Sequence, residues 1–119
     1  MDNKVTIEEL KNKVKQFCED RDWDQFHNPK DLAIGIATEA CELLERFRFK
    51  SNVESTKLMS SDKRLLVEDE LADVLYFVLR FAQINNIDLS QALENKIKSN
   101  DAKYPTEKVK GNNKKYDEY

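Results

Sequence analysis

DKRLLVEDELADVLYFVLRFAQINN, residues 62–86, is the stretch of sequence that decides the fold. A helix turns about 100° per residue, so six of these side chains fall within one arc of about 80°: Leu66, Glu70, Asp73, Phe77, Phe81 and Ile84. Most of the arc is apolar, which predicts one long helix with this face turned toward other helices. We expect the opposite face to lie in solvent, with Asp69, Tyr76, Arg80 and Gln83.

Two carboxylates, Glu70 and Asp73, interrupt the apolar arc although a polar face is available on the same helix. Acidic pairs three residues apart arise often by chance in an acidic chain, so their position carries more weight than their spacing. A carboxylate is costly to bury unless it has a cation, a basic partner or a proton. The arc therefore predicts a charged site between helices.

A second helix is expected from Asn28, with Pro29 at its first helical position, to about Phe49. Small residues such as Gly35 keep part of its surface thin, so a neighbouring helix can approach closely. Its apolar arc contains Leu32, Ala33, Ile36, Ala40, Leu43, Leu44 and Phe47. Glu39 lies at the edge of this arc and Glu42 about 60° beyond it. Packing against residues 62–86 would gather four carboxylates in one small volume.

Such a cluster needs positive charge. Two carboxylates about 5 Å apart repel by roughly 3 kcal/mol at an effective dielectric constant of 20. Oxygen ligands without Cys or His favour Mg²⁺, Mn²⁺ or Ca²⁺ over zinc, and Mg²⁺ prefers phosphate oxygens as its remaining ligands. The residues thus predict a phosphorylated substrate. The alternative is a set of ion pairs between helices that uses Arg46, Arg48, Lys50 or Arg80.

The rest of the chain predicts two more helices. One begins at Thr6, with Glu9 completing a capping box, and ends near Asp22. The other runs from Asp88 to about Tyr104. Residues 23–27 form a short connector and residues 51–61 a polar, mobile loop. The expected architecture is an all-α, antiparallel four-helix bundle in residues 1–104, oligomerising through helix faces, with a polar tail in residues 105–119 that tyrosines could dock.

Composition excludes several classes of protein. The chain has 119 residues, 23 acidic and 20 basic, with a net charge of −3, which argues against a nucleic-acid partner. Two glycines and two prolines are too few for a β-sandwich or a glycine-loop nucleotide fold. Cys18 and Cys41 are expected to be buried, reduced thiols. Without a signal peptide or an apolar run of about 20 residues, we expect a cytoplasmic protein with no membrane partner.

The acidic pairs read Glu39-Ala-Cys-Glu42 and Glu70-Leu-Ala-Asp73, and this pattern resembles the MazG-like all-α nucleoside triphosphate pyrophosphohydrolases. The similarity covers most of the chain and points to the dCTP pyrophosphatase branch. It includes RDWDQFHNP at residues 21–29, the fourth helix with Lys96, Asn100, Tyr104 and Pro105, and KKY at residues 114–116.

The resemblance implies Mg²⁺-dependent cleavage of a nucleoside triphosphate, dCTP-like or modified, to monophosphate and pyrophosphate, a house-cleaning reaction. Mn²⁺ could replace Mg²⁺. It implies that the metal-binding and catalytic residues are Glu39, Glu42, Glu70 and Asp73. The substrate-binding residues would be Trp23, His27, Phe49, Phe77, Lys96, Asn100 and Tyr104. Phe49 and Phe77 stand where the branch often has Trp and Tyr, so each keeps an aromatic face without a hydrogen-bond donor. The family also forms dimers and dimers of dimers.

Two other functions compete with this interpretation. One is a non-catalytic helical interaction module whose acids form salt bridges between helices. The other is a di-iron bundle protein, but that site needs Glu-x-x-His on two helices and this chain has one histidine.

Overall fold

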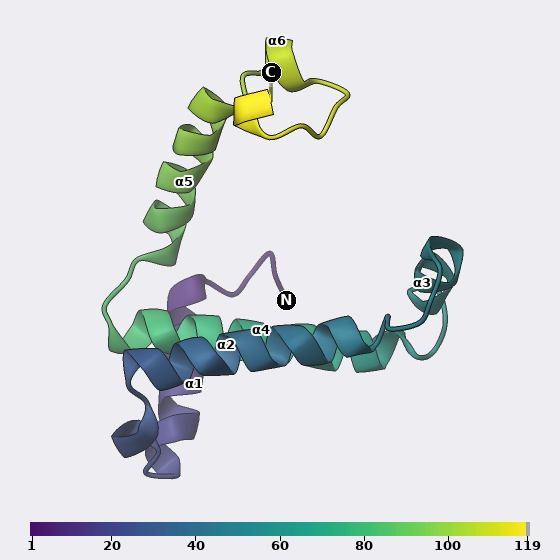
Figure 1. Ribbon diagram of the computed structural model, residues 1–119. Coiled ribbons are helices and arrows are strands. Elements are labelled where there is room, and N and C mark those ends of the chain that lie inside the picture. Colours follow the sequence, from purple (N-terminus) through teal and green to yellow (C-terminus); the bar gives the residue numbers. More distant parts are fainter. Residues whose placement is uncertain (119) are drawn as a thin grey trace. The chain divides into compact units, whose positions relative to one another are not determined.

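A computed structural model describes residues 1–118, and its regular elements in that range are all helices (Figure 1). They are α1 (Ile7–Asp20), η1 (Asp24–Phe26), α2 (Pro29–Glu45), α3 (Asn52–Leu58), α4 (Arg64–Ile84), α5 (Leu89–Lys103), α6 (Thr106–Val109) and η2 (Tyr116–Glu118). The predicted all-α class is confirmed. The chain forms two compact units, residues 1–86 and the residues from Ile87 onward, and each is described by itself. No helix among residues 1–118 combines the length and the apolar character that a membrane crossing demands.

The first unit is built on α2 and α4, which lie side by side and run in opposite directions (Figure 1). Gly35 makes their close approach possible. A Cβ atom at this position would lie 2.6 Å from two ring carbons of Phe77, so the ring occupies the space that a larger residue would fill. The thin surface predicted on the second helix is therefore confirmed at this point.

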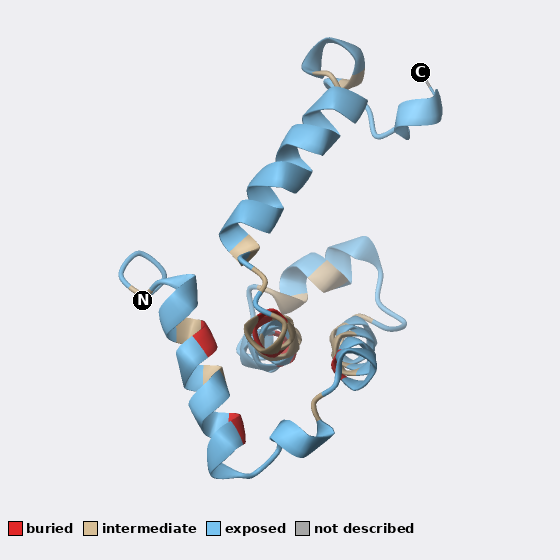
Figure 2. Ribbon diagram, turned by 90° about the vertical axis from the view of Figure 1, so that its left-hand side faces the viewer, coloured by how far each residue is buried: buried red, intermediate tan, exposed pale blue. Residues whose placement is uncertain are grey.

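Helix α1 packs against α4 as a third helix. The Thr6 hydroxyl accepts a hydrogen bond from the Glu9 backbone N–H at 3.1 Å, so the predicted N-cap is confirmed. Cys18 is fully buried, with its Sγ 3.0 Å from the Tyr76 hydroxyl oxygen, and Figure 2 shows the buried positions of α1 on one side of the helix. Both cysteines are free thiols, but Cys41 is exposed, so its predicted burial is wrong.

The face of α4 opposite the carboxylates is partly covered. Tyr76 and Gln83 are half-buried, and Arg80 is only 1% exposed, so the prediction that these side chains face solvent is wrong. Helix α1 and the 24–27 segment cover this face and supply its polar partners. Asp69 is exposed, as predicted.

Helix α2 presents a different stripe to α4 from the one that its apolar residues predict. The buried and half-buried positions between its N-terminus and the turn that follows it are Leu32, Gly35, Ile36, Glu39, Leu43, Arg46 and Phe47. Ala33, Ala40 and Leu44 are exposed, so their predicted burial is wrong. The face of α2 that packs against α4 includes Glu39 and Arg46. This face is therefore rotated about the helix axis relative to the predicted apolar arc.

Residues 46–61 also differ from expectation. Helix α2 ends at Glu45, not near Phe49, and Phe49 adopts a left-handed backbone with φ of 64°. The predicted mobile loop at 51–61 contains α3. Its N-terminus carries a complete capping box, in which the Ser51 hydroxyl and the Glu54 carboxylate each accept a backbone N–H of the other residue. The Ser-x-x-Glu pattern was present in the sequence and predicts this helix.

The second unit contains the predicted fourth helix, α5, which begins after Asp88. The Asp88 carboxylate accepts a hydrogen bond from the Gln91 backbone N–H at 2.8 Å. The rings of Tyr104 and Tyr116 meet edge to face, with centroids 6.0 Å apart, so a tyrosine holds the tail to the end of α5. The completion of a bundle by this helix and the domain boundary at residue 104 stay predictions.

Candidate metal centre

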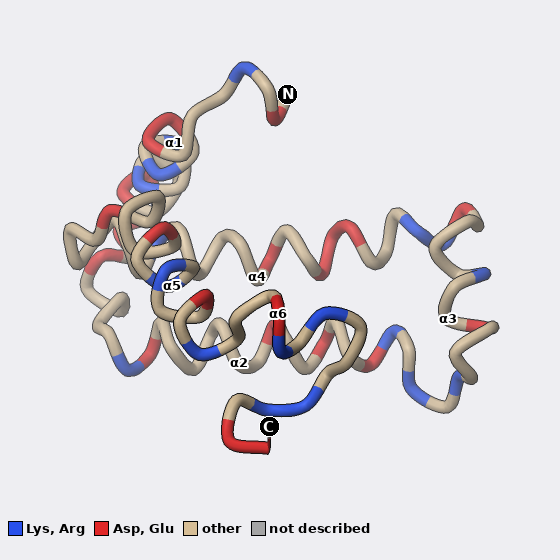
Figure 3. Tube along the Cα trace, turned by 90° about the horizontal axis from the view of Figure 1, so that it is seen from above, with Lys and Arg blue, Asp and Glu red and all other residues tan. Residues whose placement is uncertain are grey.

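Four carboxylates from two helices form one cluster. Glu39 and Glu42 come from successive turns of α2, and Glu70 and Asp73 from successive turns of α4. One oxygen from each of the four lies within 4.8 Å of the others. Figure 3 shows acidic segments along both helices of this pair. The antiparallel packing of α2 on α4 therefore brings together the two acidic pairs that the sequence predicts to be neighbours.

The cluster is buried on one side and open on the other. Glu70 is 9% exposed and Glu39 is half-buried, whereas Glu42 and Asp73 are exposed. The Oε2 atom of Glu39 is buried and accepts no hydrogen bond from the part of the chain that the structure describes. A buried carboxylate oxygen without a partner is costly. It marks a place where a ligand would supply the missing interaction.

The charges of the cluster act on one another. The pKa of Glu39 is raised to about 6, first by burial and then by a hydrogen bond with Glu42. The negative charges of Glu42, Asp73 and Glu70 raise it further. Each contribution disfavours the ionised form of Glu39. A cation bound among the four oxygens would reverse this effect.

Arg46 partly neutralises the cluster. Its Nε and Nη2 atoms donate to Oε1 of Glu70 at 3.2 and 2.7 Å. Among residues 1–118, the other three carboxylates form no ion pair with a lysine or arginine. Ion pairing between helices therefore accounts for one acid of the four. The donor set is made of carboxylate oxygens and includes the unpartnered Oε2, so it fits a hard divalent cation such as Mg²⁺ or Mn²⁺.

Trp23 and His27 flank η1, and the buried Arg80 holds His27. The Arg80 guanidinium donates to Nδ1 of His27 at 2.9 Å and also bonds the carboxylate of Asp24. Since Nδ1 accepts, the neutral ring carries its proton on Nε2. Burial and the Arg80 charge lower the pKa of His27, and the Asp24 charge opposes them. The Trp23 and His27 rings lie edge to face, 6.3 Å between centroids.

The remaining predicted substrate residues occupy three places. Phe49 is 89% exposed, with the Arg48 guanidinium 4.5 Å from its ring centroid. Phe77 is half-buried against Gly35, inside the α2–α4 interface. Lys96, Asn100 and Tyr104 belong to the second unit, and the Tyr104 backbone N–H donates to the Asn100 carbonyl. These assignments stay predictions.

Sequence reasoning missed the structural role of Arg80 and the position of Lys63. A charged residue inside the apolar run FVLRFA, residues 77–82, was a signal for a buried arginine that needs partners. Lys63 lies beside a cavity next to the carboxylates, together with Arg46 and Lys50. Leu58 of α3 lines the same cavity, and the sequence interpretation treated α3 as part of a loop.

Comparisons with known families, proteins and structures all identify pyrophosphatases or their family as similar to this chain. Residues 34–119 match the MazG-like family. The chain is 33% identical over 112 residues to dCTP pyrophosphatase 1 of Mus musculus, covering 93% of this chain and 66% of that protein. It is 32% identical over 114 residues to the Homo sapiens protein of the same name, covering 95% and 67%. It thus spans about two thirds of these relatives. The crystal structure of a pyrophosphatase from Archaeoglobus fulgidus superposes with a TM-score of 0.78 and 36% identity, over 83% of this chain and 92% of that one.

Proposed function

The chain belongs to the MazG-like family, and from this premise we propose that it is a nucleoside triphosphate pyrophosphohydrolase. The observation that carries the proposal is the set of four carboxylates within 4.8 Å, three of which have no basic partner among residues 1–118. A non-catalytic module held by salt bridges would not need three unpaired acids at the interface of its two main helices. The same arrangement suits an enzyme that binds a metal ion together with a polyphosphate.

Glu39, Glu42, Glu70 and Asp73 would hold Mg²⁺, or Mn²⁺ in its place. Such an ion neutralises phosphate oxygens and lowers the pKa of a bound water. The residues of the chain perform the remaining tasks: they fix the position of the four oxygens, and through Arg46 they hold Glu70 in place while the site is free of metal.

The reaction is hydrolysis of the anhydride between the α- and β-phosphates. A water oxygen forms a bond to one of the two phosphorus atoms of this anhydride. The bond from that phosphorus to the bridging oxygen breaks, and the bridging oxygen keeps the electron pair on the other product. The water gives up one proton to solvent. The products are a nucleoside monophosphate and pyrophosphate.

The preferred substrate is dCTP or a modified relative of it. Two named relatives are dCTP pyrophosphatases, and the RDWDQFHNP segment carries Trp23 and His27. The indole of Trp23 offers an aromatic face, and the Nε2–H of His27 offers one donor whose tautomer Arg80 fixes. Such a donor would recognise an acceptor on the nucleobase or sugar. The other substrate-binding residues are Phe49, Phe77, Lys96, Asn100 and Tyr104.

The protein would act as a dimer or a tetramer. In the first unit, α4 exposes Leu71 (56%) and Leu75 (47%) beside a shallow apolar groove of about 430 Å³, and α2 exposes Ile34 (54%) and Leu44 (69%). A second copy of the chain would cover such faces, and large exposed apolar patches are costly in an isolated subunit. Sedimentation of the Leu71→Asp, Leu75→Asp double variant tests this: it should sediment as a monomer, and an unchanged oligomer would contradict the assignment.

An enzyme of this kind would clean or balance the free nucleotide pool. We therefore assign it to the cytoplasm, with nucleotides rather than nucleic acids as its ligands. The net charge of −3 argues against nucleic acids as ligands.

The test is product analysis by ³¹P NMR with a panel of standard and modified triphosphates, with Mg²⁺ and with EDTA. We expect equal amounts of monophosphate and pyrophosphate from the cytidine-type substrates, and turnover only with the metal. The Glu70→Ala variant should keep its helical circular dichroism and lose activity. Release of orthophosphate, or equal turnover in EDTA, would contradict the proposal. An absence of turnover with every triphosphate would favour the non-catalytic module.

A further inference from the structure

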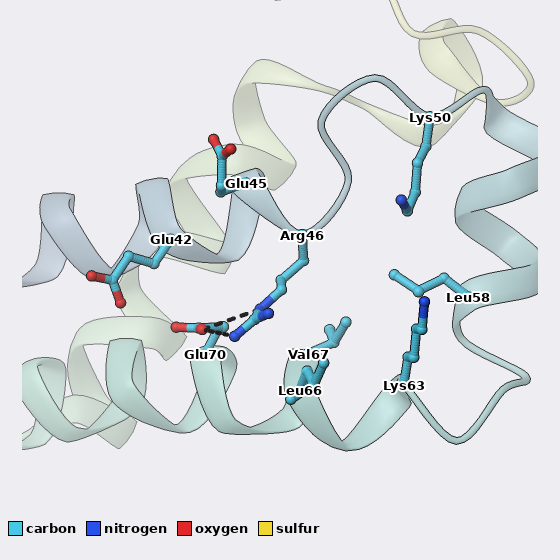
Figure 4. Close-up of a pocket in the computed structure, with 9 residues that line it drawn as sticks. All are labelled: Glu42, Glu45, Arg46, Lys50, Leu58, Lys63, Leu66, Val67 and Glu70. Atoms are coloured by element: carbon cyan, nitrogen blue, oxygen red, sulfur yellow. Dashed lines mark hydrogen bonds and ion pairs between the residues drawn. The ribbon is translucent and has the colours of Figure 1, made fainter.

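A cavity of about 480 Å³ lies beside the carboxylate cluster, among α2, α3 and α4 of the first unit (Figure 4). Glu42 and Glu70, two acids of its lining that belong to the cluster, lie at one end. Glu45 also belongs to the lining, but its carboxylate points away from Arg46 in Figure 4 and pairs with Arg48 at 3.4 Å. Lys50 and Lys63 lie at the other end, on either side of Leu58. The cavity therefore leads from the predicted metal site toward positive charge.

The two lysines approach the same space from opposite sides. Lys50 follows the turn after α2, and Lys63 immediately precedes α4, so α3 and its two connections bring them together. Figure 4 shows their side chains pointing toward each other across the cavity. Within residues 1–118 neither ammonium group forms an ion pair. Two like charges that face one space without a counter-ion repel each other, and a bound anion would remove this cost.

Arg46 lies between the two ends. Its Nε and Nη2 atoms are used by Glu70, and Figure 4 shows the guanidinium pointing into the cavity from α2. The Nη1 group makes no hydrogen bond within the described residues. A planar guanidinium suits phosphate oxygens well. Arg46 can therefore donate to an anion that spans the distance between the acidic end and the lysines.

We propose that Arg46, Lys50 and Lys63 form the subsite that binds the β- and γ-phosphates of the substrate, and hence the pyrophosphate product. This inference rests on the proposed function and adds the direction in which the triphosphate lies. The α–β anhydride lies at the carboxylates, the terminal phosphates extend toward α3, and the nucleoside lies on the other side of the cluster. Donors placed where negative charge accumulates stabilise a phosphoryl-transfer transition state as well as the bound substrate.

The test compares the wild type with the Lys50→Gln, Lys63→Gln double variant, using Lys57→Gln as a matched control. Lys57 lies on α3 but does not line the cavity. Loss of a hydrogen bond to a charged group weakens binding by roughly tenfold or more. In the double variant we expect the inhibition constant of pyrophosphate to rise by about 30-fold or more. The KM for the triphosphate should rise in parallel, while inhibition by the monophosphate product should be unchanged. Lys57→Gln should match the wild type.

Unchanged inhibition by pyrophosphate would overturn the inference, and so would equal weakening of pyrophosphate and monophosphate binding. Calorimetry with magnesium pyrophosphate separates this question from catalysis, because it needs no turnover. The wild type could bind pyrophosphate, lose this binding in the double variant, and yet hydrolyse no triphosphate. That result would support the subsite and refute the activity. Turnover combined with unchanged pyrophosphate binding would support the activity and refute the subsite.

Discussion

Replacement of Glu39 by Gln should make the metal-free protein more stable, although it removes a proposed metal ligand. Glu39 is half-buried, its Oε2 has no hydrogen-bond partner in residues 1–118, and its pKa is raised to about 6. At pH 8 the carboxylate is still ionised and is repelled by the other acids of the cluster. The amide of Gln has nearly the same shape but carries no charge.

The magnitude follows from the 4.8 Å spacing of the cluster. Two unit charges at this distance repel by about 3.5 kcal/mol at an effective dielectric constant of 20 and by about 0.9 kcal/mol in water. Glu42 and Asp73 are exposed, so each contributes near the lower value, and the charge of Glu70 is offset by Arg46. The two exposed acids give an expected stabilisation of about 2 kcal/mol, or an increase in Tm of about 10 °C.

The assay is thermal unfolding at pH 8 in EDTA and in saturating Mg²⁺. In EDTA, Glu39→Gln should melt above the wild type. In Mg²⁺ the order should reverse, since an ion present at 100 times its Kd stabilises the wild type by about 2.7 kcal/mol and the variant would bind it weakly. Asp69→Asn, on the exposed surface of α4 outside the cluster, is the control and should leave both values nearly unchanged. A variant that melts below the wild type in EDTA would refute the reasoning, because Glu39 would then make a stabilising contact.

Four further changes test the packing and the hydrogen bonds around the site. Gly35→Ala should destabilise the chain by about 1–3 kcal/mol in urea unfolding, because its Cβ would lie 2.6 Å from the Phe77 ring; an unchanged midpoint would show that α2 and α4 are not in close contact. Because the pKa of His27 is lowered in the folded state, the unfolded chain binds this proton more readily, and the free energy of unfolding should fall as the pH drops below about 6.5. In His27→Gln the free energy of unfolding should depend less on pH in this range. An equal pH dependence in the wild type and the variant would contradict the assignment. Arg80→Met should raise the pKa of His27 and move its proton between ring nitrogens, as seen by ¹⁵N NMR, and an unchanged spectrum would show that the Arg80–His27 bond is absent. Ser51→Ala should cost about 1 kcal/mol and loosen α3 in hydrogen exchange, and an equally protected α3 would show that the capping box is dispensable.

The sequence predicts the acidic cluster because a charge that interrupts an apolar arc is a strong signal. Glu70 is buried on the predicted face of α4, and the second acidic pair approaches it from α2. This inference needed only helical geometry and the cost of burying a carboxylate. The helix bounds at Arg64–Ile84 and Leu89–Lys103 follow the predicted ranges within about two residues at each end.

The sequence interpretation failed where a polar side chain packs by finding partners far along the chain. Arg80 is buried because Asp24 and His27, more than 50 residues earlier, accept its hydrogen bonds. Arg46 lies on the packed face of α2 because Glu70 accepts from it. A count of apolar residues on one helix cannot identify partners on another, so the packed face of α2 was set wrongly at Leu44.

The most direct measurement is anomalous diffraction from crystals that contain Mn²⁺ and a triphosphate analogue with a nonhydrolysable α–β link. We expect a manganese peak bonded to oxygens of Glu39, Glu42, Glu70 and Asp73, at about 2.0–2.2 Å for a small octahedral cation. Phosphate oxygens should complete its ligands. A manganese peak elsewhere in the molecule would contradict the account. So would four carboxylates with no manganese between them and the Arg46–Glu70 ion pair still in place.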